Sequence, residues 1–294
     1  FMIKKLYFVL AGIILIFMSC RKAPETAESC EFSNSEENNF TIINNDDSPE
    51  RAFNVFCKKV DVFGVYIYAT ENVPDNDLLH TANIMAQYLD NDEDSIVDNA
   101  LVLDKMIENQ SAMVLFGKES SNKKKIFLRS ANSLEGSHIF QDLYGDEIHP
   151  EWNHNSPFDA TLEEVLHLIT HSGFSKVYPS VFGEEKGSEI SNAMDKARGG
   201  YFKDVPKDYP SNTWYSYDDK TCEYNCQVTE YFYWALTSLL GAQDFPGRYD
   251  EIGHEWKANT PSLVESMDSD VYNILTDTLY KLPGVLPDGS YRRQ

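Results

Sequence analysis

The chain has 294 residues, with 47 acidic and 25 basic side chains, and its formal net charge is -22. This charge argues against nucleic acid and anionic membrane surfaces as partners, because a polyanion repels the chain and no basic stripe offsets the repulsion. Apolar residues make up 42% of the sequence, which excludes a wholly disordered chain. The acidity suits metal cations, cationic partners or simple solubility.

The first residues have the composition of an export signal. Two lysines precede an apolar run that is too short to span a bilayer, so residues 1–19 are predicted to be a signal peptide. Cys20 follows the small residue Ser19, and this pair resembles the lipobox of bacterial lipoproteins, although Phe17 stands where that family usually has Leu. The resemblance implies a lipid on Cys20 and an exported protein anchored in the membrane of the bacterial cell envelope. The alternative is an ordinary signal peptide with a chance cysteine.

The next segment changes from polar to globular composition. Residues 20–51 are rich in Asn, Ser, Glu and Asp, which bury little surface, so they are predicted to form a flexible tether. We expect a single globular domain over 52–294. Its predicted parts are a sheet-containing region at 52–158 and a helical region at 159–294.

Four further cysteines predict disulfides, because an even number in an exported protein usually pairs. Their spacing favours Cys30 with Cys57 and Cys222 with Cys226. Free buried thiols are an alternative. A four-cysteine zinc site fits less well, since the spacing differs from that of usual zinc ligands.

Local patterns predict the order of strands and helices. The predicted strands are 60–70, 111–116, 125–129 and a short edge strand within 139–148. The predicted helices are 78–89, 161–171, 188–198, 225–241, 247–257, 261–266 and 269–280. Strands followed by helices indicate an α+β fold, in which a small N-terminal mixed or antiparallel sheet with a backing helix precedes a mainly helical half.

An acidic run after the first predicted helix has the spacing of an EF-hand-like calcium loop. Its positions 1, 3, 5, 7 and 9 are Asp90, Asp92, Asp94, Ile96 and Asp98. Alternating carboxylates and the backbone carbonyl of Ile96 supply the hard oxygens that calcium prefers, so we expect structural calcium here. Ser95 replaces the usual Gly at position 6, and Leu101 replaces the bidentate Glu at position 12, unless Asp104 substitutes for it. The alternative is a solvated acidic turn.

The segment 159–173 carries the strongest chemical signal. Thr161 and Glu164 form a capping box that predicts a helix start, and Gly173 is predicted to end the helix. Because residues three and four apart are neighbours on a helix, one face of it collects several possible ligands. These residues are Glu163, Glu164, His167 and His171. Two histidines four apart on a helix commonly hold one zinc ion.

This helix resembles the zincin metallopeptidases, whose signature is H-E-x-x-H, with His167 and His171 at the metal-ligand positions. Leu168 departs from the pattern, because the family places its general base there. Glu163 or Glu164 on the preceding turn would have to replace that base as the catalytic carboxylate. The resemblance implies a zincin-like fold, zinc as cofactor and a peptide or protein substrate.

The third metal ligand has two candidates. Glu189 lies on the next predicted helix, where the gluzincin branch places a ligand Glu, and Asp195 follows it at an unusual spacing. Glu230 lies in a strongly apolar helix, where a buried carboxylate must be paired or bound to metal. Glu189 is the preferred ligand and Glu230 the second candidate.

We therefore expect a cell-surface metal-dependent hydrolase, most simply a zinc peptidase with its metal on the His-x-x-x-His helix. The main alternative is a catalytically inactive zincin-like or calcium-binding lipoprotein that binds peptide or glycan, with the aromatic stretch 201–217 lining a groove. The histidines can also be purely structural, and Glu230 can pair with Arg198. A second E-x-x-H motif, ending at His254, leaves a di-metal carboxylate site open. The sequence makes no prediction of oligomeric state.

Overall fold

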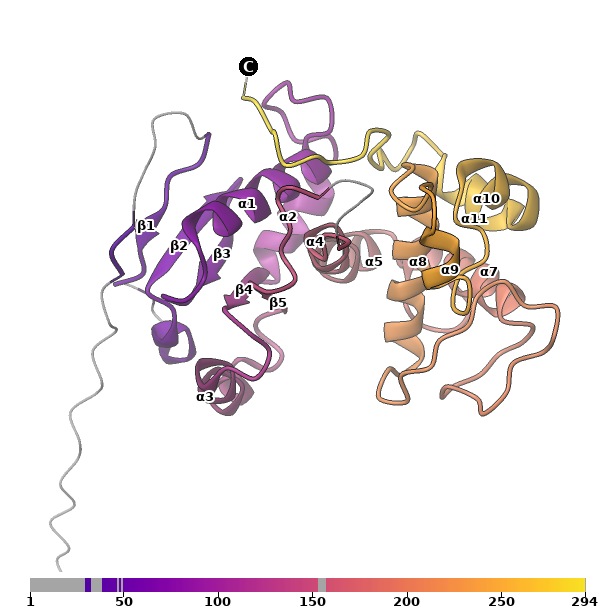
Figure 1. The fold of residues 1–294 in the computed structure, drawn as a ribbon, viewed down its shortest axis with the longest axis horizontal. Helices are drawn as coiled ribbons and strands as arrows, with labels where there is room; N and C mark the ends of the chain where they lie inside the picture. Colours follow the sequence, from indigo (N-terminus) through magenta and orange to yellow (C-terminus); the bar gives the residue numbers. More distant parts are fainter. Residues whose placement is uncertain (1–29, 33–38, 47, 49, 153–156, 294) are drawn as a thin grey trace, which may run out of the picture.

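The computed structural model describes residues 30–32, 39–46, 48, 50–152 and 157–293. The predicted signal peptide, Cys20 and most of the predicted tether lie outside these residues. No helix in the described part of the chain has the length and apolar character needed to cross a bilayer. The expected α+β class is confirmed, since a five-stranded mixed sheet precedes a mainly helical half (Figure 1).

The spatial order of the sheet follows the chain. Its strands are β1 (Ile43–Asn44), β2 (Lys58–Val62), β3 (Val65–Ala69), β4 (Ala112–Phe116) and β5 (Phe140–Tyr144). The pairs β1–β2 and β2–β3 are antiparallel, whereas β3–β4 and β4–β5 are parallel. The predicted strand 111–116 and the predicted edge strand within 139–148 are confirmed by β4 and β5.

The single strand predicted over 60–70 is wrong, because this stretch is a hairpin of β2 and β3. The chain turns at Phe63 and Gly64, whose φ angles are 54° and 95°. The N–H of Gly64 donates to Asp61 Oδ1 at 2.7 Å and closes the turn. Two positive φ angles are typical of the turns that match strand twist, but Phe in place of the usual Asn hides the turn in the sequence.

The predicted strand 125–129 is also wrong, since it lies within the helix α3 (Asn122–Ala131). Ser121 caps the N-terminus of α3 through a side-chain hydrogen bond. Phe127 and Ala131 are buried and four residues apart, whereas both neighbours of Phe127 are exposed. This burial has helical rather than alternating periodicity, which a window of five residues cannot reveal.

The two faces of the sheet pack against different elements (Figure 1). The helices α1 (Asp75–Leu89) and α4 (Thr161–Ile169) share the larger apolar core with β2, β3 and β4. The 3-10 helix η1 (Arg51–Val55) and α3 cover the other face with a smaller aromatic core. The predicted helix at 78–89 is confirmed by α1, which backs the sheet.

Five of the remaining helices correspond to predicted ones, with different bounds. They are α7 (Glu189–Ala197), α8 (Tyr224–Leu239), α9 (Arg248–Ile252), α10 (Pro261–Met267) and α11 (Ser269–Leu275). The helices α2 (Ala100–Glu108), α5 (Ser175–Val177) and α6 (Pro179–Phe182) have no counterpart among the predicted ranges. The structure pairs Cys30 with Cys57 and Cys222 with Cys226, which are the pairs that the spacing favours. The second disulfide spans the start of α8.

The predicted helix end at Gly173 is wrong. α4 continues directly into the π-helix η3 (Thr170–Phe174) and then into α5. A Cβ on Gly173 would lie 2.7 Å from Val102 Cγ1 and 3.2 Å from Met106 Cγ. Both side chains belong to α2, so the glycine is needed for the close approach of α2 to η3.

The C-terminal segment returns from the helical half across α1 and the acidic loop (Figure 1). Gln87 Oε1 accepts a hydrogen bond from the Gly289 N–H at 2.8 Å. The Tyr291 hydroxyl donates to Asp90 Oδ2 at 2.5 Å, and the Tyr291 ring is buried in the larger core. Both ends of the described chain therefore belong to the sheet-containing half.

Gly173→Ala is expected to destabilise the fold by about 1–3 kcal/mol, because the added methyl group must displace side chains of α2. Urea unfolding monitored by circular dichroism measures the change. Gly284→Ala is the matched control, since a Cβ at that position meets no atom within 4 Å. Equal unfolding midpoints for the two variants would contradict the close packing at Gly173.

Candidate metal centre

A buried ion pair holds the start of α4. His80 Nε2 on α1 lies 2.6 Å from Asp159 Oδ2, and the two side chains are 8% and 3% exposed. Asp159 Oδ1 accepts hydrogen bonds from the N–H groups of His149 and Thr161, both at 3.1 Å. The predicted capping box of Thr161 and Glu164 is therefore wrong, because Asp159 satisfies the first turn of the helix instead.

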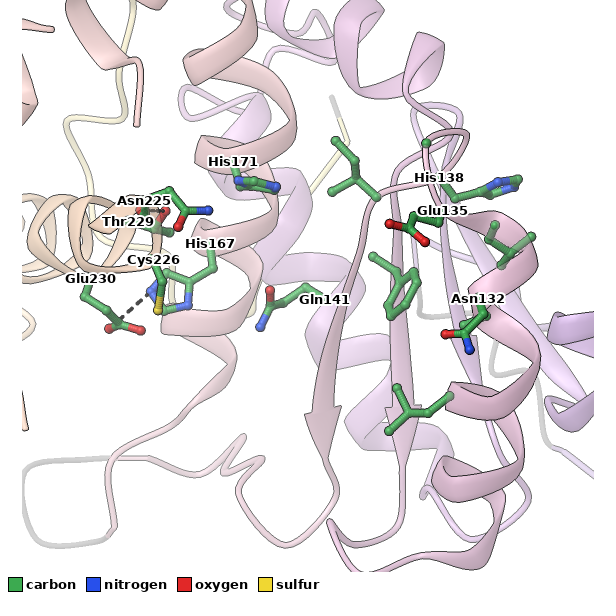
Figure 2. A pocket seen from close by; sticks show the side chains of 16 residues that line it. Asn132, Glu135, His138, Gln141, His167, His171, Asn225, Cys226, Thr229 and Glu230 are labelled. Carbon is green, nitrogen blue, oxygen red and sulfur yellow. Dashed lines mark hydrogen bonds and ion pairs between the residues drawn. The ribbon is translucent and has the colours of Figure 1, made fainter. Parts of the chain in front are cut away.

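Carboxylates surround His167, which is 6% exposed. Its Nδ1 lies 3.5 Å from Glu164 Oε2, and its Nε2 lies 3.6 Å from Glu230 Oε2. Glu163, Glu164 and His167 each offer one ligand atom within 4.8 Å of the others. Figure 2 shows His167 of α4 facing Glu230 of α8. The structure thus brings together four of the residues that the sequence analysis singled out.

Each of the three carboxylates also has a hydrogen-bond donor from elsewhere in the fold. Tyr233 donates to Glu163, and Gln141 donates to Glu164. Tyr217 donates to Glu230. Gln141 lies on β5, so the sheet and both helices contribute to one centre. The sequence carries no signal for these donors, because they become neighbours only in the folded chain.

The centre contains more acidic groups than basic ones. Burial, reinforced by Glu230 and Glu164, raises the pKa of Glu163 to about 8. Burial also raises the pKa of Glu230. Burial alone would lower the pKa of His167, but the surrounding carboxylates raise it to about 10. Three carboxylates that crowd one imidazole favour the binding of a cation.

The Nε2 atom of His167 is buried and has no hydrogen-bond partner among the described residues. Its 3.6 Å separation from Glu230 Oε2 is too long for a hydrogen bond. Two ligand atoms that share a tetrahedral zinc at about 2.1 Å lie roughly 3.4 Å apart. The facing atoms of His167 and Glu230 therefore have the separation of two ligands of one metal ion.

The metal-ligand pair on α4 lies one turn earlier than the predicted pair of His167 and His171. Glu163 and His167 are four residues apart, and Glu164 directly follows the first of them. This is the H-E-x-x-H spacing with a carboxylate at its first position. Leu168 is 1% exposed and lies in the core, so its lack of a carboxylate does not affect this arrangement.

His171 is not brought to the centre. Its Nδ1 lies 2.6 Å from Glu184 Oε1, and its side chain is 39% exposed. His171 belongs to η3, where the wider turn changes the angular register relative to α4. Among the described residues, the groups whose ligand atoms converge do not include His171.

The other predicted partners are also separate from the centre. Glu189 begins α7, is exposed and does not line the cleft beside His167. Arg198 pairs with Asp195 at 2.7 Å rather than with Glu230. His254 is 65% exposed and pairs with the adjacent Glu255, so the second E-x-x-H motif does not join the first. Glu230, not Glu189, is the residue that the fold brings to His167.

A cleft of about 560 Å³ opens beside the centre. One wall contains His167, His171 and Glu230, and the opposite wall is formed by α3, the 3-10 helix η2 (Asn132–Leu134) and β5 (Figure 2). The described residues that line this cleft include no Lys or Arg. The centre is therefore reachable by a molecule that occupies the cleft.

The aromatic stretch 201–217 contributes mainly to packing. Tyr215 is fully buried, and its hydroxyl donates to the Gln227 carbonyl at 2.8 Å. Trp214 Nε1 donates to Asp268 Oδ2 at 2.6 Å. Tyr201 alone among these rings is strongly exposed, at 45%, whereas Tyr217 reaches the metal centre.

The acidic loop has part of the geometry expected of a calcium loop. Asp90, Asp92 and Asp94 each offer an oxygen within 4.8 Å of the others. Ser95, at position 6, has a φ of 72°, which is the sharp turn that Gly provides in EF-hand loops. The Ile96 N–H donates to Asp94 Oδ1 at 2.8 Å.

The remaining positions of the loop depart from the EF-hand pattern. Asp98 Oδ2 accepts a hydrogen bond from the Asn91 N–H at 2.8 Å. Leu101, at position 12, is 61% exposed on α2, and Asp104 is not among the residues that converge with the loop carboxylates. Calcium binding at this loop stays a prediction.

Asp159→Asn is expected to cost about 1–3 kcal/mol of unfolding free energy at neutral pH, because buried His80 loses its carboxylate partner. Burial alone would raise the pKa of Asp159, but its hydrogen bonds lower it below its usual value. The stabilisation in the wild type is therefore complete above the usual carboxyl pKa and is lost as the pH falls through the lowered one. Denaturant titrations of the wild type and of Asp159→Asn measure the difference in unfolding free energy. They are carried out from about pH 2 to about pH 7, a range that covers the acid transition.

The matched control is Asp146→Asn, which changes an exposed carboxylate in the same half of the fold. Its stability should follow the wild type at every pH. If Asp159→Asn also followed the wild type, the ion pair would not hold α4.

Calcium at about 100 times its dissociation constant is expected to raise the melting temperature by roughly 5–10 °C, through binding to the folded acidic loop. Differential scanning calorimetry with calcium or with EDTA measures the shift. Asp92→Asn combined with Asp94→Asn should remove it, whereas Glu265→Gln, an exposed change far from the loop in sequence, should not. An unchanged melting temperature in excess EDTA would argue against calcium.

Comparison with protein-family models finds no match to this chain. No curated protein matches it significantly, and neither does any solved structure. A function for the cleft therefore has to be argued from its own geometry and chemistry.

Proposed function

We propose that this protein is a metal-dependent hydrolase whose zinc ion is held by Glu163, His167 and Glu230. The observation that carries the proposal is the buried, unpartnered Nε2 of His167, which faces Glu230 Oε2 at 3.6 Å. Imidazole and carboxylate groups both bind zinc, and three protein ligands leave a further position for water or substrate. Zinc in such a site acts as a Lewis acid that polarises a substrate carbonyl.

Glu164 is the proposed general base. It follows Glu163 directly on α4, so its carboxylate lies beside the ligands without being needed as one. Gln141 Nε2 donates to Glu164 Oε2 at 2.5 Å, so a residue that lines the cleft holds the Glu164 side chain. A positioned carboxylate can accept the proton of an attacking water.

A peptide or protein is the proposed substrate class. β5 is the last strand of the sheet, and it lies beside the cleft through Ile139, Phe140 and Gln141. An extended peptide can pair with such a strand edge through main-chain hydrogen bonds. If residues 1–19 direct export and Cys20 carries a lipid, this hydrolase acts at the surface of the bacterial cell envelope.

A catalytically inactive binding protein is the second candidate. The observation that favours it is that Glu164 Oε2 already has two partners. It accepts a hydrogen bond from Gln141 and lies 3.5 Å from His167 Nδ1. A carboxylate occupied in this way is less available as a base. In this alternative the cleft binds peptide, and the metal has a structural role.

His167→Ala and Glu230→Gln are each expected to weaken zinc binding by more than about 100-fold, since loss of an outer partner alone costs about 10- to 100-fold. Isothermal titration calorimetry of the metal-free protein measures the affinity. His254→Ala is the control, because that exposed histidine lies outside the cleft. Wild-type protein that binds no zinc would refute the proposal.

Glu164→Gln is expected to retain zinc and to lower hydrolysis of quenched fluorescent casein by about 100-fold or more, because it removes the proton acceptor. Turnover is compared at saturating zinc. Zinc binding without any hydrolysis by the wild type would instead support the inactive binding protein.

A further inference from the structure

We propose that His171 is a second catalytic residue of the cleft, which donates a proton to the leaving group, and that Glu184 positions it. This inference rests on the proposed hydrolase function. It replaces the metal-ligand role that the sequence analysis gave to His171 with a different chemical role in the same cleft.

A buried carboxylate contacts one ring nitrogen of His171. His171 Nδ1 lies 2.6 Å from Glu184 Oε1, and the Glu184 side chain is 8% exposed. Thr229 Oγ1 donates to the same oxygen at 3.2 Å, and Lys176 Nζ donates to Glu184 Oε2 at 3.4 Å. The carboxylate is therefore held from several sides, and it can hold the imidazole in one orientation.

The other ring nitrogen of His171 is left for a molecule in the cleft. A carboxylate at Nδ1 favours the form with hydrogen on that atom, so Nε2 is left to exchange a proton with a ligand. Glu184 is the only side-chain hydrogen-bond partner of His171 among the described residues. The His171 side chain is 39% exposed and lines the cleft together with Glu230 (Figure 2).

His171 is separate from the metal centre. Among the described residues, His167 converges with Glu163 and Glu164 and also forms an ion pair with Glu230, whereas the ion pair of His171 is with Glu184. The cleft lining includes no Lys or Arg in the described residues, so histidines are its main proton donors. His138 lies on the opposite wall, without a buried carboxylate as its recorded partner (Figure 2).

The proposed step conserves atoms and charge. The oxygen of one water molecule bonds to the carbonyl carbon, and Glu164 takes one proton from that water. The C–N bond then breaks, its electron pair stays on nitrogen, and the nitrogen takes the Nε2 proton of a His171 ring that is protonated on both nitrogens, which leaves neutral His171 with hydrogen on Nδ1. The proton on Glu164 passes through solvent to His171, which returns both residues to their starting states. The products are a free carboxyl group and a free amine.

The test compares wild type with His171→Ala, Glu184→Gln and the control His254→Ala, with quenched fluorescent casein as substrate. We expect His171→Ala to lower kcat by about 100-fold, the usual size of a general-acid contribution, with little change in KM. Added imidazole should restore part of the lost activity. Glu184→Gln should lower kcat less, because the imidazole remains but is held less well.

Two measurements do not depend on turnover. Calorimetry should give the same zinc affinity for His171→Ala and wild type. Nitrogen-15 NMR of the zinc-free protein should find hydrogen on Nδ1 of His171, and Glu184→Gln should alter that signal. Thermal melting of each variant verifies its fold, and Glu184→Gln provides an independent test if His171→Ala is unstable.

The outcomes separate this inference from the hydrolase proposal. An active wild type with unchanged kcat in His171→Ala overturns the role of His171 and leaves the hydrolase standing. Loss of zinc from His171→Ala also overturns it, because the residue is then a ligand. A wild type that binds zinc but never cleaves casein overturns both proposals.

Discussion

The buried pair of His80 and Asp159 determines where α4 begins, and the proposed metal centre depends on that position. Asp159 joins α1 to the first turn of α4 and also holds the backbone at His149. A buried carboxylate is costly to leave without its hydrogen-bond partners, so this pair tolerates little displacement. The direction of α4 from this point places Glu163 and His167 opposite α8. A shift of the helix start would separate both residues from Glu230.

Carboxylates of this acidic chain converge at two places in the fold. At the centre, three glutamates and one histidine come from two helices, and Tyr and Gln side chains complete their hydrogen bonds. At the loop, the aspartates converge within one turn, and the C-terminal segment binds to it through Tyr291. Like charges at such distances repel, so both places favour a bound cation. A cation that binds at either place would therefore stabilise the folded chain.

The sequence predicts those parts of the fold that depend on local pattern. α1, α4, α8 and β4 have long or strongly apolar patterns, and all are present. The hairpin at Phe63 and the helix α3 were missed because a positive φ and a five-residue window leave little local signal. In the centre, helical spacing identified His167 and Glu163. Helical spacing could not show that Glu184 contacts His171, since that contact depends on η3 and on the loop before α7.

The π-helix after α4 also determines the angle at which His171 leaves the helix. A π-helix is an α-helix with one residue added to a turn, and each residue turns the helix by about 100°. Deletion of Thr170 would rotate His171 relative to His167 by about that angle. A single-codon deletion at this position would therefore be expected to separate His171 from Glu184, whereas a deletion later in the π-helix would rotate only the residues that follow it.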